Sequence, residues 1–400
     1  MMEKKNDHAG KVVVLCGGAA FFCSFIDRLA WPPVIPLAAK ELGLTGAQAG
    51  GFMSAFFFGY LLTQLPGGMM ADRWGTRKVL LISLVLMGLF TVSIAWIPDY
   101  LTGLVMRFLA GLGSGAVLAA SVKGVYDYFD PARRATAMGF FMASGPLGLL
   151  VANLMSPAIA ASYGWRMSFL IAGTMTLLVW ILSWKLLPRR GVAHLVSQKG
   201  DRLDSVGRLF KNRDLMLTAG AGFFAMWGTW GTLTWANAYM SSSLGLTLQQ
   251  SGRMMALFGC GALIGQPLAG WLADRYLGRR RQTGMAILGL FGILLAWFGT
   301  NRDTGLLILL VPLLGAGSFI FGPVLNTFIS ELVSPRQVAT AIGLCNAIWQ
   351  VGSLISPLTA GIILDWTGSY SAAFSVLAAG PLIAVAILAM VRTSGIGEGR

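Results

Sequence analysis

This 400-residue sequence contains few charged residues. Asp, Glu, Lys and Arg make up 12% of the residues, hydrophobic residues make up 56%, and the mean hydropathy is +0.70. Such a chain has too few polar side chains to cover a surface in contact with water, which excludes a water-soluble fold. Apolar runs of about twenty residues, each long enough to cross the hydrocarbon core of a bilayer, recur along the whole length. Lipid is therefore the solvent for most of this protein.

Histidine and cysteine are also scarce. The two histidines, His8 and His194, lie outside the apolar runs, so they cannot build a catalytic or metal site within the membrane. The four cysteines all lie inside apolar runs: Cys16, Cys23, Cys260 and Cys345. Because they lack CxxC spacing, we expect small apolar side chains rather than disulfides or metal ligands. The sequence predicts no enzyme, no cofactor and no metal site.

The apolar runs predict an all-α membrane protein with twelve transmembrane helices. The expected spans are 11–38, 48–70, 79–97, 101–125, 135–161, 166–187, 215–240, 250–272, 283–300, 305–328, 337–363 and 370–391. The first run is too long for a cleavable signal peptide and no small-residue cleavage site follows it, so we expect it to be retained. A hydrophilic stretch at the midpoint predicts a cytoplasmic linker over 189–213, between six-helix bundles at 1–188 and 214–400.

The net charge of +14 comes from basic residues placed between alternate apolar runs. One side holds Lys4, Lys5, Arg73, Arg77, Lys78, Arg133, Arg134, the stretch 189–213, Arg275, Arg279, Arg280, Arg281, Arg336 and Arg392. The opposite loops hold little beyond Lys40, Arg166, Arg253 and Arg302. This asymmetry follows the positive-inside rule and predicts a multi-pass protein of the inner (plasma) membrane with both termini in the cytoplasm. It also argues against a nucleic-acid partner.

Three sequence elements recur half a chain length apart, which predicts a duplicated architecture. Gly-x-x-Ala-Asp-Arg at 68–73 reappears at 270–275, in each case before a further Gly and basic residues. Ala-Thr-Ala-Met-Gly at 135–139 matches Ala-Thr-Ala-Ile-Gly at 339–343, and Ser-Pro at 156–157 matches Ser-Pro at 356–357. We therefore expect two pseudo-symmetric six-helix bundles.

The element at 68–78, Gly-x-x-Ala-Asp-Arg-x-Gly-x-Arg-Lys, resembles the signature of the major facilitator superfamily. Its second copy falls where that family's duplication would place it, and Arg-Phe-Leu-Ala-Gly-Leu-Gly-Ser-Gly at 107–115 resembles a second family signature. The resemblance implies alternating access around a site near the bilayer midplane. It also implies a conformational latch on the cytoplasmic side, at Gly68, Asp72, Arg73, Gly75, Arg77, Asp274 and Arg275.

Two further elements look like the anion:cation symporter branch of that family. They are Phe-Ile-Asp-Arg at 25–28 and Gly-Tyr-x-x-x-Gln-x-Pro-Gly-Gly at 59–68. The branch carries sugar acids, other organic anions and phosphate. Members that move protons with sugar acids commonly have a glutamate seven residues after the arginine of span 4. Here that position is Ser114, a departure that bears on the route of proton coupling.

Charges inside the spans are expected to be functional, because each costs at least about 2.5 kcal/mol at a helix centre. Asp27 and Arg28 point about 100° apart on a helix, so each needs its own partner. Asp27 lies about 16 Å and Arg107 about 9 Å from the outer ends of their spans. We expect a network in which Arg28 or Arg107 binds a substrate carboxylate and Asp27 is the coupling group. The alternative is an ion network that only holds helices together. Lys123 either joins the site or reaches the interface, with Asp127 as a partner.

The second half offers no matching charge, and its candidate contacts are aromatic and amide side chains: Trp227, Trp230, Trp235, Asn237, Tyr239 and Asn326. Tyr239 fits an interfacial aromatic belt better than a cavity. The predicted substrate-binding set is Arg28, Arg107, Tyr60, Trp230, Asn237 and Asn326.

The leading hypothesis is a monomeric secondary transporter of a small organic anion, a carboxylate or sugar acid, coupled to H⁺ or Na⁺. No Gly-x-x-x-x-Gly-Lys-[Ser/Thr] loop is present for ATP-driven transport by this chain alone. A second hypothesis is a proton-coupled drug or metabolite exporter. Such exporters tend to carry Gly-x-x-x-Gly-Pro-x-x-Gly-Gly in span 5, of which only Gly145-Pro146-Leu-Gly148 is kept. A third is a membrane receptor or scaffold, for which no soluble signalling domain is seen. Lipid is the expected surrounding partner.

Overall fold

The structure, a computed structural model, describes residues 2–189, 207–275, 279–334 and 337–392, and within these ranges the regular elements are helices. The first half holds α1 (Met2–Leu29), α2 (Ile35–Leu42), α3 (Gly46–Trp74), α4 (Thr76–Ser93), α5 (Tyr100–Tyr128), α6 (Pro131–Tyr163) and α7 (Trp165–Leu186). Short 3₁₀ turns, η1 (Pro32–Val34) and η2 (Ile94–Trp96), follow α1 and α4. The second half holds α9 (Arg213–Ser243), α10 (Leu248–Arg275), α11 (Arg280–Thr300), α12 (Leu307–Leu332), α13 (Val338–Thr367) and α14 (Tyr370–Ala389).

Length and hydropathy confirm a multi-pass membrane protein. In the part of the chain that the structure describes, 10 helices are long and apolar enough to cross a membrane. Helices α3 and α9 are as long, but glycine, amide and hydroxyl residues lower their hydropathy. The expected all-α fold is thus confirmed, while the count of twelve spans stays a prediction.

The chain divides into two compact units. Unit 1 comprises the described residues of Met1–Val196 together with Ala236–Ala256, and unit 2 those of Ser197–Trp235 and Leu257–Arg400. The end of α9 and the start of α10 therefore belong to unit 1. The linker expected at 189–213 falls largely on 190–206, outside the described residues.

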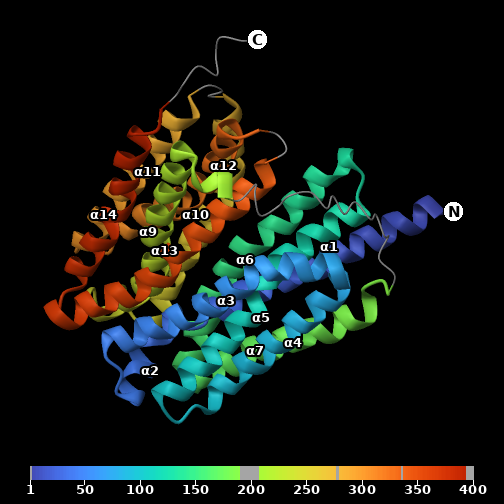
Figure 1. Ribbon diagram of the computed structural model, residues 1–400. Helices are drawn as coiled ribbons and strands as arrows, with labels where there is room; N and C mark the ends of the chain where they lie inside the picture. The colour runs from blue at the N-terminus through green and yellow to red at the C-terminus, as the bar shows by residue number, and fades with distance from the viewer. Residues whose placement is uncertain (1, 190–206, 276–278, 335–336, 393–400) are drawn as a thin grey trace. The chain divides into compact units, whose positions relative to one another are not determined.

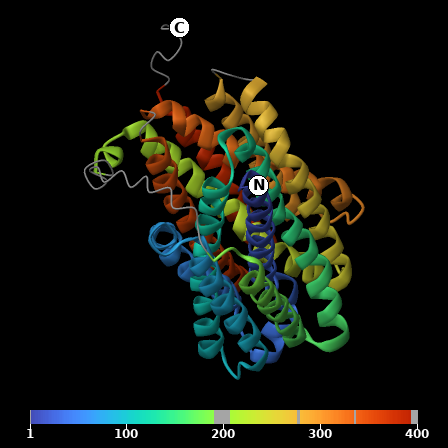
Figure 2. The same ribbon diagram turned by 90° about the vertical axis from the view of Figure 1, so that its right-hand side faces the viewer.

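Glycines set the close packing of unit 1, where α3 lies along α5 and α1 contacts α5, α6 and α7 (Figures 1 and 2). A Cβ atom added at Gly59 of α3 would collide with the carbonyl oxygen of Phe108, and one at Gly111 of α5 with that of Phe56. The two backbones thus touch, as helices do in membranes when small residues line their interface. This crossing fixes α3 and α5 at the depth of the buried charges described below.

Unit 2 repeats this packing. A Cβ at Gly261 of α10 would collide with the Pro312 carbonyl oxygen, and one at Gly315 of α12 with that of Phe258. The signal in the sequence is the similar spacing of the two glycine pairs, Gly59 with Gly111 and Gly261 with Gly315. The same close approach therefore serves α3 with α5 and α10 with α12.

The starts of α3 and α10 are also built alike. Thr45 and Gln48 form a capping box, in which each side chain accepts a hydrogen bond from the other's backbone N–H, and Thr247 and Gln250 form the same two bonds. Each box follows a glycine at positive φ, +62° at Gly43 and +71° at Gly245. These Gly-Leu-Thr-x-x-Gln segments are a fourth recurring element, missed in the sequence.

Candidate functional site

Three charged side chains are buried among the described residues, and all belong to unit 1. They are Asp27 and Arg28 near the end of α1, and Arg107 in α5, with exposed fractions of 0%, 2% and 0%. The described residues of unit 2 bury no charged side chain, in line with the expected asymmetry. A charge without water needs local compensation, so the surroundings of each group define what it can do.

Arg107 is occupied by backbone carbonyl oxygens. Its Nη1 donates to the carbonyl of Asp27 at 2.9 Å and its Nη2 to that of Arg28 at 3.1 Å, while Nε donates to that of Phe52 at 3.3 Å. The Arg28 carbonyl needs such a donor because Pro32, four residues later, has no N–H to continue the helical bonding. Arg107 therefore caps the end of α1 and joins it to α3.

Arg28 lies in a cage of aromatic rings. Its guanidinium carbon is 4.6 Å from the ring centroid of Tyr60, and 5.2 to 5.4 Å from those of Phe25, Phe56 and Phe57. Ring faces attract a cation without neutralising it, and the attraction strengthens when water is excluded. The cage therefore holds the guanidinium of Arg28 in place among aromatic rings.

Asp27 faces a different neighbour from Arg28, as the expected divergence of their side chains requires. Its Oδ2 accepts a hydrogen bond of 2.9 Å from Thr176 Oγ1 of α7, while its Oδ1 is buried without a hydrogen-bond partner among the described residues. The hydrogen bond that links it to Arg107 runs through its backbone carbonyl. Hydrogen bonds thus run from the Arg107 guanidinium to the backbone carbonyls of Asp27 and Arg28, and the expected side-chain network stays a prediction.

A hydroxyl pair takes the position where the symporter branch commonly has a glutamate. Ser114 Oγ of α5 lies 2.6 Å from Ser24 Oγ of α1, and both side chains are buried. Two serine hydroxyls therefore lie one helical turn from Asp27, where a carboxylate would be expected. Among the described residues, Asp27 is the buried acidic side chain.

Of the other predicted contact residues, Tyr60 lies beside Arg28, and Asn237, Trp230 and Asn326 lie elsewhere. Tyr60 belongs to the cage around Arg28, whereas Asn237 donates a hydrogen bond of 3.0 Å to Asn153 of α6 within unit 1. Trp230 is buried in unit 2, and the buried Oδ1 of Asn326 has no partner among the described residues. The structure brings Tyr60 to the charge cluster and gives Asn237 a protein partner of its own.

The predicted latch residues lie at the α3–α4 loop. Asp72 Oδ1 is 3.8 Å from Lys123 Nζ, and Lys123 is 2.9 Å from Asp127, the partner expected for it. Arg77 donates to the carbonyl oxygens of Trp184 and Leu187 at 2.6 and 2.7 Å and so ties α4 to the end of α7. Arg73 is exposed in the last turn of α3, Gly75 is the residue between α3 and α4, and Gly68 lies one helical turn before Asp72.

The second copy of the latch is partly described. In unit 2, Arg281 donates to the carbonyl of Val391 at 2.6 Å, which repeats the bond from Arg77 to Leu187. Arg275 is exposed at the end of α10, and the Asp274 side chain lies outside the described residues. The anchoring arginine therefore occurs in both units.

Several residues of the site were not found from the sequence. The rings of Phe25, Phe56 and Phe57 were missed, although Phe-Phe-Phe-Gly-Tyr at 56–60 is an unusual aromatic run for a helix with a buried cation nearby. Thr176 gave no signal, because a threonine in an apolar helix most often bonds its own backbone. Spatial proximity between distant helices decided both cases.

Comparison with known proteins identifies the class. A model of the Major Facilitator Superfamily matches residues 17–252 and 218–396, so the chain belongs to this family of transporters, whose members are not enzymes. This confirms the resemblance seen in the loop and span 4 elements.

Relatives of known name include a probable sulfoacetate transporter of Cupriavidus necator, 28% identical over 92% of this chain and 90% of that protein. A hexuronate transporter of Bacillus subtilis is 26% identical over 92% of this chain and 91% of its own length. Among solved structures, a nucleoside transporter has a TM-score of 0.79 at 16% identity, covering 95% of this chain and 99% of that one. The structural likeness supports the fold.

Proposed function

We propose that this protein is a secondary active transporter of a small organic anion, working by alternating access and coupled to protons or another cation. The two relatives named above, and a cis,cis-muconate transport protein of Acinetobacter baylyi at 25% identity, have anionic substrates in their names. Carboxylate or sulfonate groups are common to those substrates. A site for such an anion needs a cation held away from water.

The observation that carries the proposal is Arg28 in its aromatic cage. Arg107 is bound to three carbonyl oxygens, whereas Arg28 lies among ring faces, and we infer that its guanidinium binds the substrate carboxylate in fork geometry. We assign Arg28 as the anion-binding cation, with Tyr60 beside it and Arg107 as a positioning residue. Trp230, Asn237 and Asn326 remain proposed contacts of the second half.

Asp27 is the proposed coupling group. It is buried beside Arg107 and adjacent in sequence to Arg28, so a substrate anion bound at Arg28 adds negative charge near Asp27 and favours its protonation. A proton taken up by Asp27 together with the anion links the two fluxes. With serine at position 114, the coupling is assigned to a single buried carboxylate.

The same proposal places the protein in the inner membrane as two six-helix bundles with both termini in the cytoplasm, following the distribution of Lys and Arg. The latch residues Asp72, Arg73 and Arg77, with Asp274 and Arg275 in the second copy, would close the cytoplasmic side. The repeated capping boxes, glycine crossings and arginine anchors support the duplication.

The test uses Asp27→Asn in proteoliposomes, with glucuronate, sulfoacetate and cis,cis-muconate as trial substrates. We expect retained exchange of the transported anion and loss of its proton-driven accumulation, because the variant can bind anion but cannot carry the proton. Asp303→Asn is the control, since Asn can keep the Oδ1 acceptor of this exposed turn. Uphill uptake by Asp27→Asn equal to wild type would contradict the coupling role.

No contact of the described residues favours the alternative hypothesis, a proton-coupled exporter. A Cβ at Gly145 would meet the rings of Phe21 and Phe25, and one at Gly148 would meet the Phe22 carbonyl. The two glycines that remain of the exporter element therefore serve close packing of α6 on α1.

A further inference from the structure

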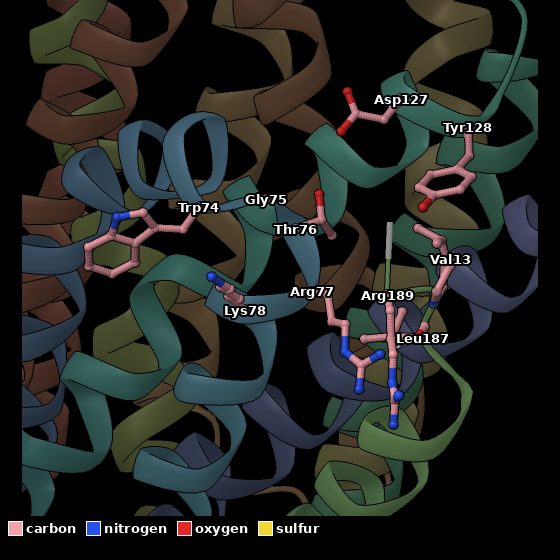
Figure 3. Close-up of a pocket in the computed structure, with 11 residues that line it drawn as sticks. Val13, Trp74, Gly75, Thr76, Arg77, Lys78, Asp127, Tyr128, Leu187 and Arg189 are labelled. Carbon is pink, nitrogen blue, oxygen red and sulfur yellow. Dashed lines mark hydrogen bonds between the residues drawn. The ribbon is translucent and has the colours of Figure 1, made fainter. Parts of the chain in front are cut away.

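A polar cavity lies in unit 1, away from the buried charges, beside the α3–α4 loop. It has a volume of about 320 Å³ and is lined by the middle of α1 at Val13, the C-terminal ends of α3, α5 and α7, and the start of α4 (Figure 3). Its lining residues are Val13, Trp74, Gly75, Thr76, Arg77, Lys78, Asp127, Tyr128, Leu187, Pro188 and Arg189. Three of them are basic and one is acidic, so the cavity carries net positive charge.

The N-terminus of α4 opens into this cavity without a cap. Gly75, the N-cap residue, has φ of +85° and no side chain to cap the helix, and the first helical bond runs from the Val79 N–H to the Gly75 carbonyl. The N–H groups of residues 76–78 therefore have no partner within the helix. Free N–H groups and the helix dipole together favour an anion at this position.

The hydroxyl of Thr76 is an independent indication of a ligand. Thr76 is 8% exposed and lines the cavity, and its Oγ1 is buried without a hydrogen-bond partner among the described residues. A buried hydroxyl without a partner is unfavourable, and a bound acceptor would satisfy it. Figure 3 shows Thr76 between the turns that carry Gly75 and Asp127.

The charged neighbours leave room for an anion. Asp127, the acidic residue of the lining, is neutralised by Lys123 at 2.9 Å. Arg77 is fixed by the carbonyls of Trp184 and Leu187 and contributes its charge, while Lys78 is exposed and able to reach a ligand. The remaining wall includes the side chains of Val13, Trp74, Tyr128, Leu187, Pro188 and Arg189.

The geometry points to a phosphate-binding site at the N-terminus of α4, formed by the N–H groups of residues 76–78, the Thr76 hydroxyl and Lys78. The ligand is the phosphate group of an anionic phospholipid headgroup or of a soluble phosphate, which have the same recognition chemistry. Basic pockets between membrane helices bind such headgroups, and the half-exposed Trp74 is typical of an interface residue. This site is separate from Arg28, and its occupancy would act on the loop that carries the latch residues.

The test measures the apparent melting temperature of the full-length protein in detergent, titrated with phosphatidylglycerol, inorganic phosphate, or diacylglycerol as the lipid without phosphate. We expect phosphatidylglycerol or inorganic phosphate, and not diacylglycerol, to raise the melting temperature, since a ligand of the folded state stabilises it. A response to phosphatidylglycerol alone assigns the lipid as the source, and a response to inorganic phosphate assigns the soluble ion. No response to either would overturn the site.

Matched variants locate the binding. Thr76→Val and Lys78→Gln should each weaken binding by about tenfold, as expected for the loss of one bond to a charged ligand. Thr76→Ser, which keeps the hydroxyl, and Lys185→Gln, an exposed lysine of α7 outside the cavity, should bind as wild type does. If Thr76→Val binds as tightly as wild type, the hydroxyl is only an unsatisfied buried group and the proposal fails. Lys78→Gln decides the matter if the valine variant does not fold.

Discussion

The two buried arginines have the same chemistry and different surroundings. Arg107 donates to the carbonyls of Asp27, Arg28 and Phe52, so its role is to hold the end of α1 on α3. Arg28 is surrounded by ring faces, and its proposed role is to bind the substrate anion. Exchanging Arg for Lys therefore has a different consequence at each position.

Arg107→Lys should destabilise the protein. A single ammonium cannot replace a planar fork that donates to three carbonyls, and the Arg28 carbonyl would lose the donor that Pro32 cannot supply. We expect a loss on the order of 2 kcal/mol, seen as a melting temperature lowered by several degrees. Arg253→Lys, at an exposed position, is the control and should leave the melting temperature unchanged. An Arg107→Lys protein as stable as wild type would show that the carbonyl bonds contribute little.

Among the described residues, the sequence predicted which charged side chains are buried better than what those side chains contact. Asp27, Arg28 and Arg107 were found because an ionisable side chain in an apolar run is rare. The separate roles of the arginines were not, because they depend on Trp31-Pro32-Pro33 ending α1 beside α5, and on rings of α3 that are distant in sequence.

In each of the two units, glycines allow one pair of helices to cross with their backbones in contact. Gly59 and Gly111 bring α3 against α5, and Gly261 and Gly315 bring α10 against α12. The helices themselves were predictable from hydropathy, but the expected span 11–38 is divided. Helix α1 ends at Leu29, and η1 and α2 follow, because Pro32 has no N–H to continue the helix. The other observed helices begin and end within a few residues of the expected spans. The crossings were not predicted, since the sequence holds 52 glycines and most of them have no such role.

Gly59→Ala and Gly261→Ala should each lower stability. The added methyl group meets a backbone carbonyl that cannot move aside without separating the helices, which costs about 1–3 kcal/mol. Gly139→Ala and Gly343→Ala are matched controls, because nothing lies within 4 Å of either Cβ position. These controls should gain up to about 1 kcal/mol from helix propensity. Melting temperatures of the four variants measure this, and a drop in the controls as well would contradict the packing account.

The whole molecule combines a repeated scaffold with an uneven distribution of charge. The capping boxes, glycine crossings and arginine anchors occur in both units, whereas the buried charges of the described residues occur in unit 1. A repeated sequence predicts a repeated scaffold, because both depend on local residue patterns. The substrate is not predictable in this way, since anions of several sizes can use one arginine.

The charge asymmetry of the loops predicts orientation, which thiol labelling can measure. In a Cys260→Ser background, which removes the one free cysteine that is not buried, Thr304→Cys should react with an impermeant reagent in intact cells. Lys211→Cys should react only after permeabilisation, because its segment is expected in the cytoplasm. Labelling of Lys211→Cys in intact cells would reverse or refute the predicted topology.

The assignment of Arg28 as the anion-binding cation is tested most directly by ligand-induced stabilisation. Wild type, Arg28→Gln and the exposed control Arg253→Gln are heated with a panel of carboxylates and sulfonates, including glucuronate, sulfoacetate and cis,cis-muconate, and with an uncharged sugar. We predict that at least one anion, and not the sugar, raises the melting temperature of wild type and Arg253→Gln but not of Arg28→Gln. Equal stabilisation of Arg28→Gln, or no stabilisation of wild type by any anion, would contradict the account.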